Sequence, residues 1–325
     1  MVVKNDTSEI ELGDMTDVDM KVYPTHDCIN DCSFCMTDLR WKNSEASTEE
    51  YLNNFERAFK AYHEAGGRKV LFTGGEPTTK PKKLIGMLKI IKDFPLELVT
   101  LYTNGLYLLK KHDGNTFLPD FGYGKPLIES LNSEGLEKIN LTVNHYDYGE
   151  IDCERRHEFG LYTKCLNMEG ILQKTKELEM EIRLNCVLLK DYIGNPEEIE
   201  NYLECAKNAG ITDVYFRDLF HLENRDNSCR FSDERKLQYT DEQRVDFNKL
   251  VQGIRDLKDF EEIGQLERHR SHGKTYMFNY KDINVSFGTL KIGTEKENEI
   301  TYFNFQPNGR VYRDMNGPES EIGGL

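Results

Sequence analysis

The sequence predicts an α/β fold built on a parallel sheet. Short apolar runs alternate with segments whose apolar residues recur at helical spacing, and the alternation yields six strand–helix units between residues 21 and about 220. A strand, a helix and a second parallel strand form a right-handed unit, so successive units build one parallel sheet with helices packed against it. Functional residues in such folds lie at the carboxyl ends of the strands.

The first three units have clear boundaries. A short strand at residues 21–25 leads into a loop that is rich in cysteine. Ser47 or Thr48, followed by two glutamates, predicts the start of a helix that ends at Gly66-Gly67. A strand at residues 70–73, a helix around residues 84–91 and a strand at residues 96–102 come next.

The second three units continue the same order. Strands are predicted at residues 138–143, 181–189 and 212–219, and helices at residues 168–178 and 196–209.

Three regions follow from this pattern. Residues 1–20 are acidic and aperiodic, and we expect a loose lead-in. Residues 21–225 hold the six units. Residues 226–325 contain a polar stretch, one helix near residues 247–257 and short strand candidates after residue 276, so we expect a small α+β extension that closes the open side of the sheet.

The composition narrows the class of partner. The chain of 325 residues has a formal net charge of −15 and a pI near 5.1, which disfavours a wide nucleic-acid interface. No apolar run reaches membrane-spanning length, and residues 1–8 lack the apolar core of a signal peptide. Three of eight cysteines are clustered, which suits a reducing compartment. We therefore expect a cytoplasmic protein with no nucleic-acid or membrane partner.

The most informative stretch is the loop from Cys28 to Cys35. Its cysteines at positions 28, 32 and 35 have CxxxCxxC spacing, which can bring three thiolates to one soft-metal centre and leave a further position open. An iron with an open position can bind a substrate or cofactor directly. The alternatives are three structural thiols or a zinc site, which needs a fourth ligand. His26 is poorly spaced for that role, and the next cysteine is Cys153.

A second motif, Gly74-Gly75-Glu76-Pro77, follows the predicted strand at residues 70–73, and the aromatic Phe34 precedes Cys35. Together with the cysteine spacing, these features resemble the radical S-adenosylmethionine (radical SAM) superfamily. The resemblance implies that Cys28, Cys32 and Cys35 hold one [4Fe-4S] cluster and that SAM chelates the fourth iron through its amino and carboxylate groups. It also implies that the Gly74–Pro77 motif binds the SAM amino group, and that the fold is a partial (β/α)6 barrel.

Later strand ends resemble the branch that contains the GTP cyclase of molybdopterin biosynthesis. Thr103-Asn104-Gly105 is similar to its third strand end, and Asn185 to its fifth-strand asparagine. The resemblance places Thr103 and Asn144 near the SAM carboxylate or ribose, Asn185 near the ribose, and the sixth strand beside the adenine. A turn-forming role is an equally good interpretation of Thr103.

One departure from that branch affects the expected chemistry. Its members carry a second cluster held by cysteines in the C-terminal part, whereas no cysteine follows Cys229 in this sequence. Residues 305–312 resemble a remnant of the hairpin that holds that cluster. We therefore expect a single cluster and not GTP cyclisation. Two other cysteines, Cys186 in a strand and Cys205 on a helix, are expected to lie in the core.

Candidate substrate residues lie near the last strands. Arg217 combines a strand end with a fixed charge suited to a phosphate or carboxylate. His145 follows the fourth strand. Cys229 could return a hydrogen atom to a product radical, although a loop thiol without such a role is the simpler interpretation.

The resemblance implies an enzyme in which the reduced cluster cleaves SAM and a 5′-deoxyadenosyl radical abstracts hydrogen from a substrate. We expect a small polar metabolite, such as a nucleoside, nucleotide or sugar, in a biosynthetic pathway, and an external reductant such as a flavodoxin or ferredoxin. The alternatives are a peptide-modifying radical SAM enzyme, a non-catalytic iron-sulfur sensor and, last, a zinc-binding structural module.

Overall fold

The computed structural model covers the chain with several gaps. It describes residues 2–5, 8–12, 14–35, 43–112, 124–146, 166–219, 234–267, 273–289, 300, 302–313 and 320–323. Two cysteines discussed above, Cys153 and Cys229, lie outside these residues.

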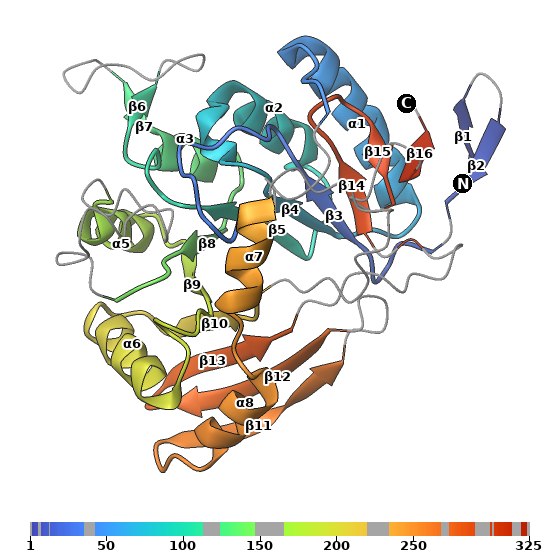
Figure 1. The fold of residues 1–325 in the computed structure, drawn as a ribbon. Helices are drawn as coiled ribbons and strands as arrows, with labels where there is room; N and C mark the ends of the chain where they lie inside the picture. Colours follow the sequence, from blue (N-terminus) through green and yellow to red (C-terminus); the bar gives the residue numbers. More distant parts are fainter. Residues whose placement is uncertain are drawn as a thin grey trace.

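Six parallel strands form the centre of one large sheet (Figure 1). Neighbouring strands in the sheet pair in parallel register throughout. In chain order the strands are β3 (Asp19–Val22), β4 (Lys69–Phe72), β5 (Leu98–Thr103), β8 (Lys138–Thr142), β9 (Glu181–Val187) and β10 (Asp213–Arg217). The prediction of six parallel strands is confirmed, with boundaries that differ by at most three residues.

The C-terminal part extends both edges of this sheet. Beside β10 lie β13 (Ile283–Gly288), which is parallel to it, and then the antiparallel β12 (Lys274–Tyr280) and β11 (Phe260–Glu267). Beside β3 lie the parallel β14 (Tyr302–Phe305) and the antiparallel β15 (Val311–Tyr312) and β16 (Glu321–Gly323). The resulting order is β11-β12-β13-β10-β9-β8-β5-β4-β3-β14-β15-β16.

The sheet is therefore open within the described ranges, and no strand pairing there joins its two edges. The sequence predicted an extension that closes the sheet. The strands of residues 226–325 instead divide between the two edges, because β3 and β10 would otherwise expose unpaired backbone N–H and C=O groups. The fold class is thus α/β with an open parallel sheet.

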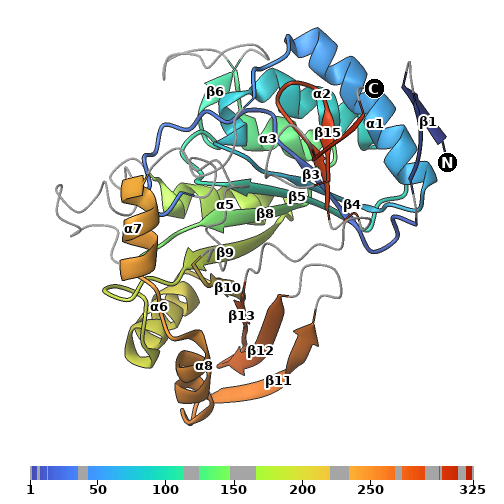
Figure 2. The same cartoon turned by 45° about the vertical axis from the view of Figure 1, so that its right-hand side comes forward.

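Helices cover one face of the sheet (Figures 1 and 2). They are α1 (Thr48–Glu64), α2 (Pro81–Ile91), α3 (Leu127–Ser133), α5 (Met168–Glu177), α6 (Pro196–Asn208) and α8 (Phe247–Arg255). Ser47 caps α1, because its side chain accepts a hydrogen bond from the Glu50 N–H at 3.2 Å. Apolar residues of α1, among them Phe55 and Phe59, are fully buried in the core.

The two faces of the sheet differ in chemistry. Leu141, Leu184 and Phe216 belong to the apolar core that also contains residues of the covering helices. Side chains alternate along a strand, so the residues between these lie on the opposite face. There, Asn185 is in register with Thr142 on β8 and with Tyr215 on β10. This second face is polar, and none of the helices named above packs on it.

Several local elements differ from the predictions. Residues 2–11, predicted as a loose lead-in, contain the antiparallel pair β1 (Val2–Asn5) and β2 (Ser8–Glu11). A second short pair, β6 (Lys111–His112) and β7 (Lys125–Pro126), precedes α3. The polar stretch after residue 226 contains α7 (Glu234–Glu242).

Cys186 is buried as predicted, but Cys205 is exposed on the outer side of α6, so the prediction that Cys205 lies in the core was wrong. Across the described ranges, no helix combines the length and apolarity required to cross a bilayer.

Candidate active site

The three clustered cysteines lie on the loop that follows β3. Cys28 is exposed, while Cys32 and Cys35 are partly exposed, and none of the three forms a disulfide with another described cysteine. The backbone N–H of Asn30 donates to the Cys28 Sγ at 3.4 Å, and the Cys35 N–H donates to the Cys32 carbonyl at 3.0 Å. An N–H that points at sulfur favours the thiolate, which is the form that binds iron.

The Gly74–Pro77 turn packs directly on the start of this cysteine loop. The Gly75 N–H donates to the Thr25 carbonyl at 3.0 Å, and the Glu76 N–H donates to the Asp27 carbonyl at 2.7 Å. A Cβ atom on Gly75 would lie 2.2 Å from the Asp27 carbonyl oxygen, and Gly74 has a φ of +126°. Both positions therefore require glycine, since any side chain would push the turn away from the loop.

Glu76 joins the second and third strand ends. Its carboxylate is 1% exposed and accepts hydrogen bonds from the Thr78 N–H (3.1 Å), the Thr78 hydroxyl (2.5 Å), the Thr103 hydroxyl (2.7 Å) and the Asn104 N–H (2.8 Å). Burial raises the pKa of Glu76, although these four hydrogen bonds act to lower it. A cation placed beside this carboxylate would offset the cost of its burial.

Asn104 links the third strand end to the cysteine loop. Its side-chain amide lies 3.9 Å from the Cys28 Sγ, within the range of an N–H···S hydrogen bond, and its own backbone binds Glu76. The pKa of Tyr107 is raised by burial and by the nearby negative charges of Glu76 and Cys28. Three strand ends thus meet at one point.

Thr78, Asn104 and Tyr107 were not chosen as site residues from the sequence. The sequence could have identified Asn104, because it lies inside the Thr103-Asn104-Gly105 motif. Thr78 gave a weaker signal, a hydroxyl two residues after a carboxylate, which is the pattern of a local side-chain cap.

The other predicted SAM-binding residues lie on neighbouring strands. Asn144 is 2% exposed, and its side-chain oxygen accepts a hydrogen bond from the Val187 N–H at 3.0 Å, so this atom holds the end of β9 against β8. Asn185 is 4% exposed and lies on the polar face.

The predicted substrate residues are less closely grouped. Arg217 is the last residue of β10 and is partly exposed. His145 stacks on Tyr146, with ring centroids 4.6 Å apart. Cys229 lies outside the described residues, so the hydrogen-donor role stays a prediction.

The cysteine loop reaches across to the ends of the later strands. Phe34 is 6% exposed and forms a small apolar cluster with Val187, Leu189 and Leu219, which follow or end β9 and β10. Cys32 packs against the same cluster. The aromatic residue before Cys35 therefore holds the loop over the sheet.

An ionic network in which Lys83 is buried supports the cysteine loop. Glu45, on the segment that returns to α1, accepts a hydrogen bond from the Thr25 hydroxyl and lies 3.1 Å from the Lys80 ammonium and 3.5 Å from the Lys83 ammonium. Lys83 also donates to the Pro24 carbonyl at 3.0 Å, and burial lowers its pKa. These contacts hold both ends of the loop against α2.

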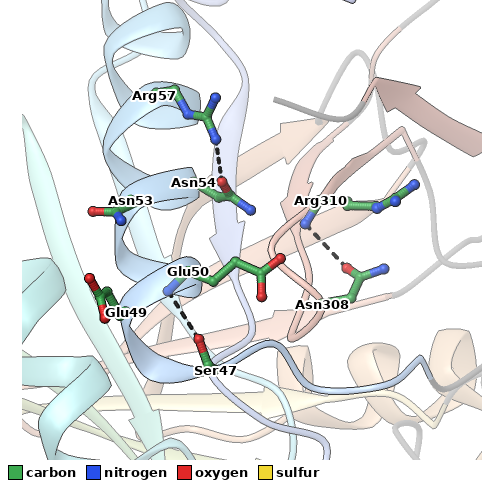
Figure 3. Close-up of a pocket in the computed structure, with 8 residues that line it drawn as sticks. All are labelled: Ser47, Glu49, Glu50, Asn53, Asn54, Arg57, Asn308 and Arg310. Carbon is green, nitrogen blue, oxygen red and sulfur yellow. Dashed lines mark hydrogen bonds between the residues drawn. The ribbon is translucent and has the colours of Figure 1, made fainter.

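An open groove of about 570 Å³ lies beside this network, between the start of α1 and the turn that joins β14 to β15 (Figure 3). It contains none of the predicted site residues. Its lining is polar and consists of Ser47, Glu49, Glu50, Asn53, Asn54, Arg57, Asn308 and Arg310.

The turn beside this groove supports the cysteine loop. The Ala46 N–H donates to the Pro307 carbonyl at 2.9 Å, and the Tyr23 N–H donates to the Phe305 carbonyl at 2.8 Å. Residues 305–312, whose sequence resembles a remnant of a cluster-binding hairpin, thus hold both ends of the loop in place.

The residues fit a [4Fe-4S] cluster. In the described part of the chain, no three His, Cys, Asp or Glu side chains converge on one point as they would around a single metal ion. A cluster does not require such convergence, because each cysteine binds a different iron. The Asn30 side-chain oxygen is buried in the same loop without a hydrogen-bond partner among the described residues, which leaves an acceptor for a bound group.

A family model described as the radical SAM superfamily matches residues 22–227, more than half of the chain. The chain belongs to the radical SAM superfamily. Its members are enzymes that use a [4Fe-4S] cluster and SAM, so the predictions of the family, of an enzyme and of its cofactors are confirmed. The open parallel sheet agrees with the partial barrel of the superfamily.

Several relatives share this radical SAM region. Molybdenum cofactor biosynthesis protein 1 of Drosophila melanogaster is 26% identical over 73% of this chain and 38% of its own length. The GTP 3′,8-cyclase of Alkaliphilus metalliredigens is 29% identical over 62% of this chain and 56% of its own length. The probable GTP 3′,8-cyclase of Sulfurisphaera tokodaii is 26% identical over the same shares. The chain thus spans about half, or less, of the curated relatives it matches.

Asp218, directly after β10, destabilises the fold near neutral pH. It is 7% exposed, and one carboxylate oxygen has no hydrogen-bond partner within the described ranges. Burial raises the pKa of Asp218 from 3.8 to about 6, although the charge of Arg244 and the Leu219 N–H act to lower it. Because the folded pKa lies above the unfolded one, stability falls as pH rises from about 4 to about 6 and then stays constant.

We expect Asp218→Asn to stabilise the protein, and the gain should be about 1 kcal/mol larger at pH 8 than at pH 5. Urea unfolding of both proteins at the two pH values measures this difference. The same gain at both pH values would show that the Asp218 charge is not the cause.

Proposed function

We propose that this radical SAM enzyme holds one [4Fe-4S] cluster on Cys28, Cys32 and Cys35 and abstracts hydrogen from a small polar metabolite. The observation that carries the proposal is the chain of contacts from Cys28 through Asn104 to Glu76. It joins the cysteine loop, the Gly74–Pro77 turn and the third strand end. A cofactor that touches the cluster and the turn at once would lie at this junction.

Each part of the junction would serve a different group of SAM. The Glu76 carboxylate and the backbone of the Gly74–Pro77 turn would attract the SAM ammonium, because a buried carboxylate with a raised pKa gains from a nearby cation. Thr103 and Asn144 would border the SAM carboxylate or ribose, and Asn185 the ribose. When bound, the cluster and SAM supply a hydrogen-abstracting adenosyl radical, and the protein supplies binding and orientation.

The polar face of the sheet supports a polar substrate. The Thr100 hydroxyl and the Asn140 side-chain oxygen are buried there, and neither has a hydrogen-bond partner among the described residues. Arg183 on the same face is already paired with Asp213 at 2.7 Å. Arg217 at the strand end offers a fixed charge for a phosphate or carboxylate group of the substrate.

The relatives favour a nucleotide among such metabolites. Two of them carry the name GTP 3′,8-cyclase, and a third is named for molybdenum cofactor biosynthesis. The matched region covers only about half of the cyclases' length, so we treat GTP as one candidate substrate. A flavodoxin or ferredoxin is the expected electron source.

The function is tested by anaerobic SAM cleavage. The protein is reconstituted with iron and sulfide, reduced, and given SAM with GTP, other nucleotides, sugars or peptides in separate reactions. We expect 5′-deoxyadenosine to form at least about tenfold faster with a nucleotide or sugar than with SAM alone, a difference of about 1.4 kcal/mol in the barrier. Stimulation by peptides alone would instead indicate peptide modification. No cleavage by a protein that holds its cluster would favour an iron-sulfur sensor.

A further inference from the structure

Helix α7 lies against the cysteine loop, although it is outside the residues that match the superfamily model. Figures 1 and 2 both show α7 beside the carboxyl ends of β8 and β9, next to the N-terminal segment that carries the cysteines. Tyr239 of α7 and Cys32 pack against the same apolar cluster around Phe34. The helix is therefore a direct neighbour of the candidate cluster site.

The contact between α7 and the loop includes a close ion pair. The Lys236 ammonium lies 2.6 Å from the carboxylate of Asp31, the residue that precedes Cys32. The Lys236 side chain is only 11% exposed, whereas the Asp31 side chain is 78% exposed. A charge that water screens poorly acts more strongly on its surroundings than an exposed one. Water therefore screens the charge of Lys236 less than the charge of Asp31.

The far end of α7 is also fixed. Gln243, which follows the helix, donates to the Asp191 carboxylate at 2.6 Å and accepts from the Asp191 N–H at 3.2 Å. The Gln243 carbonyl also accepts a hydrogen bond from the Lys190 N–H at 2.9 Å. Because these residues follow β9, the helix is held between the β9 end and the cysteine loop, and Lys236 has a defined position.

We propose that α7 is part of the iron-sulfur site and that the Lys236–Asp31 pair sets the reduction potential of the cluster. The inference rests on the proposed function, because it requires a cluster on Cys28, Cys32 and Cys35. Reduction adds one negative charge to a cluster. The Lys236 cation favours the reduced form, and the Asp31 carboxylate opposes it. Lys236 is thus a positioning and charge-setting residue.

A matching pair on the other side of the loop provides a comparison. Lys80 lies 3.4 Å from Asp27, which precedes Cys28, but there the lysine side chain is 31% exposed. Greater exposure means stronger screening. We therefore expect Lys80→Gln to shift the cluster equilibrium less than Lys236→Gln.

The test is a redox titration of the reconstituted protein without SAM, in which the reduced cluster is counted by electron paramagnetic resonance. At the potential that half-reduces the wild type, we expect Lys236→Gln to lower the reduced-to-oxidised ratio by about tenfold, which is about 59 mV for one electron. Asp31→Asn should raise the ratio. The double variant should lie between Lys236→Gln and the wild type, because the Lys236 charge is screened less than that of Asp31, and Lys236→Arg should stay near the wild type. Lys281→Gln, which removes a cation from the β12–β13 turn, is the matched control.

A purely structural role for the pair predicts a different pattern. Loss of a brace would shift Lys236→Gln and Asp31→Asn in the same direction, and that result would overturn the proposal. The proposal would also be overturned if Lys236→Gln and Asp31→Asn changed the reduced-to-oxidised ratio no more than Lys281→Gln does. If Lys236→Gln held no cluster, Asp31→Asn would decide alone: a higher ratio supports the proposal, and an unchanged or lower ratio overturns it. A wild type that binds no cluster would refute the proposed function itself. Failure of the proposed function can therefore be distinguished from failure of the redox proposal.

Discussion

Replacing Cys28, Cys32 and Cys35 together by alanine is expected to lower the iron content of the reconstituted protein from about four atoms per chain to nearly zero. Within the described ranges, these three thiolates are the cluster ligands that the proposed site offers. SAM would fill the remaining position but would not hold a cluster alone. Iron and acid-labile sulfide analysis measures the loss directly. SAM cleavage should disappear with the cluster.

The chain offers a matched control for this experiment. Cys205 is also an exposed cysteine, but it lies on α6, away from the loop, so Cys205→Ala should retain full iron content. Circular dichroism of the triple variant should match the wild-type apoprotein, because the three side chains are exposed or partly exposed. A triple variant that keeps about four irons per chain would refute the ligand assignment.

The fold was predictable where a local pattern determined it. The six parallel strands and the helices between them followed from apolar periodicity, and Ser47 marked the start of α1 because a side-chain oxygen there satisfies a free N–H. The positions of β13 and β14 were not predictable. A strand sequence fixes which face is apolar but not which edge it pairs with, and here two neighbours in sequence joined opposite edges.

The site was predictable to the extent that its residues form short motifs. The cysteine spacing and the Gly74–Pro77 motif identified the family, and the glycines had a physical reason, since their neighbours leave no room for a Cβ. Lys236 could not be found in this way. It pairs with Asp31, 205 positions away, and one lysine in a polar stretch carries no sign of such a contact. Asn104 was partly predictable, because the sequence shows its motif but not its contact with Cys28.

Two substitutions of Glu76 can separate the role of the Gly74–Pro77 motif in folding from its role in binding SAM. Glu76→Ala should lower the free energy of unfolding by about 3–5 kcal/mol, because it leaves the buried N–H groups of Thr78 and Asn104 without acceptors and opens a cavity. Glu76→Gln should cost less, about 1–2 kcal/mol, since it keeps the shape and one acceptor oxygen. Burial already raises the Glu76 pKa, so the fold gains little from the negative charge itself. Urea unfolding compares the two variants.

SAM binding should depend on the charge of Glu76 more than on the shape of its side chain. The ammonium of SAM requires the charge and not only the shape, so Glu76→Gln should weaken SAM binding by at least about tenfold, or about 1.4 kcal/mol, while its cluster content stays normal. Thr78→Val is the matched control, because it removes one hydrogen bond to Glu76 but leaves the charge in place. Equilibrium dialysis with labelled SAM measures both variants. If Glu76→Gln bound SAM as tightly as the wild type, Glu76 would serve only to join the strand ends, and the attraction for SAM would have to come from the backbone of Gly74 and Gly75.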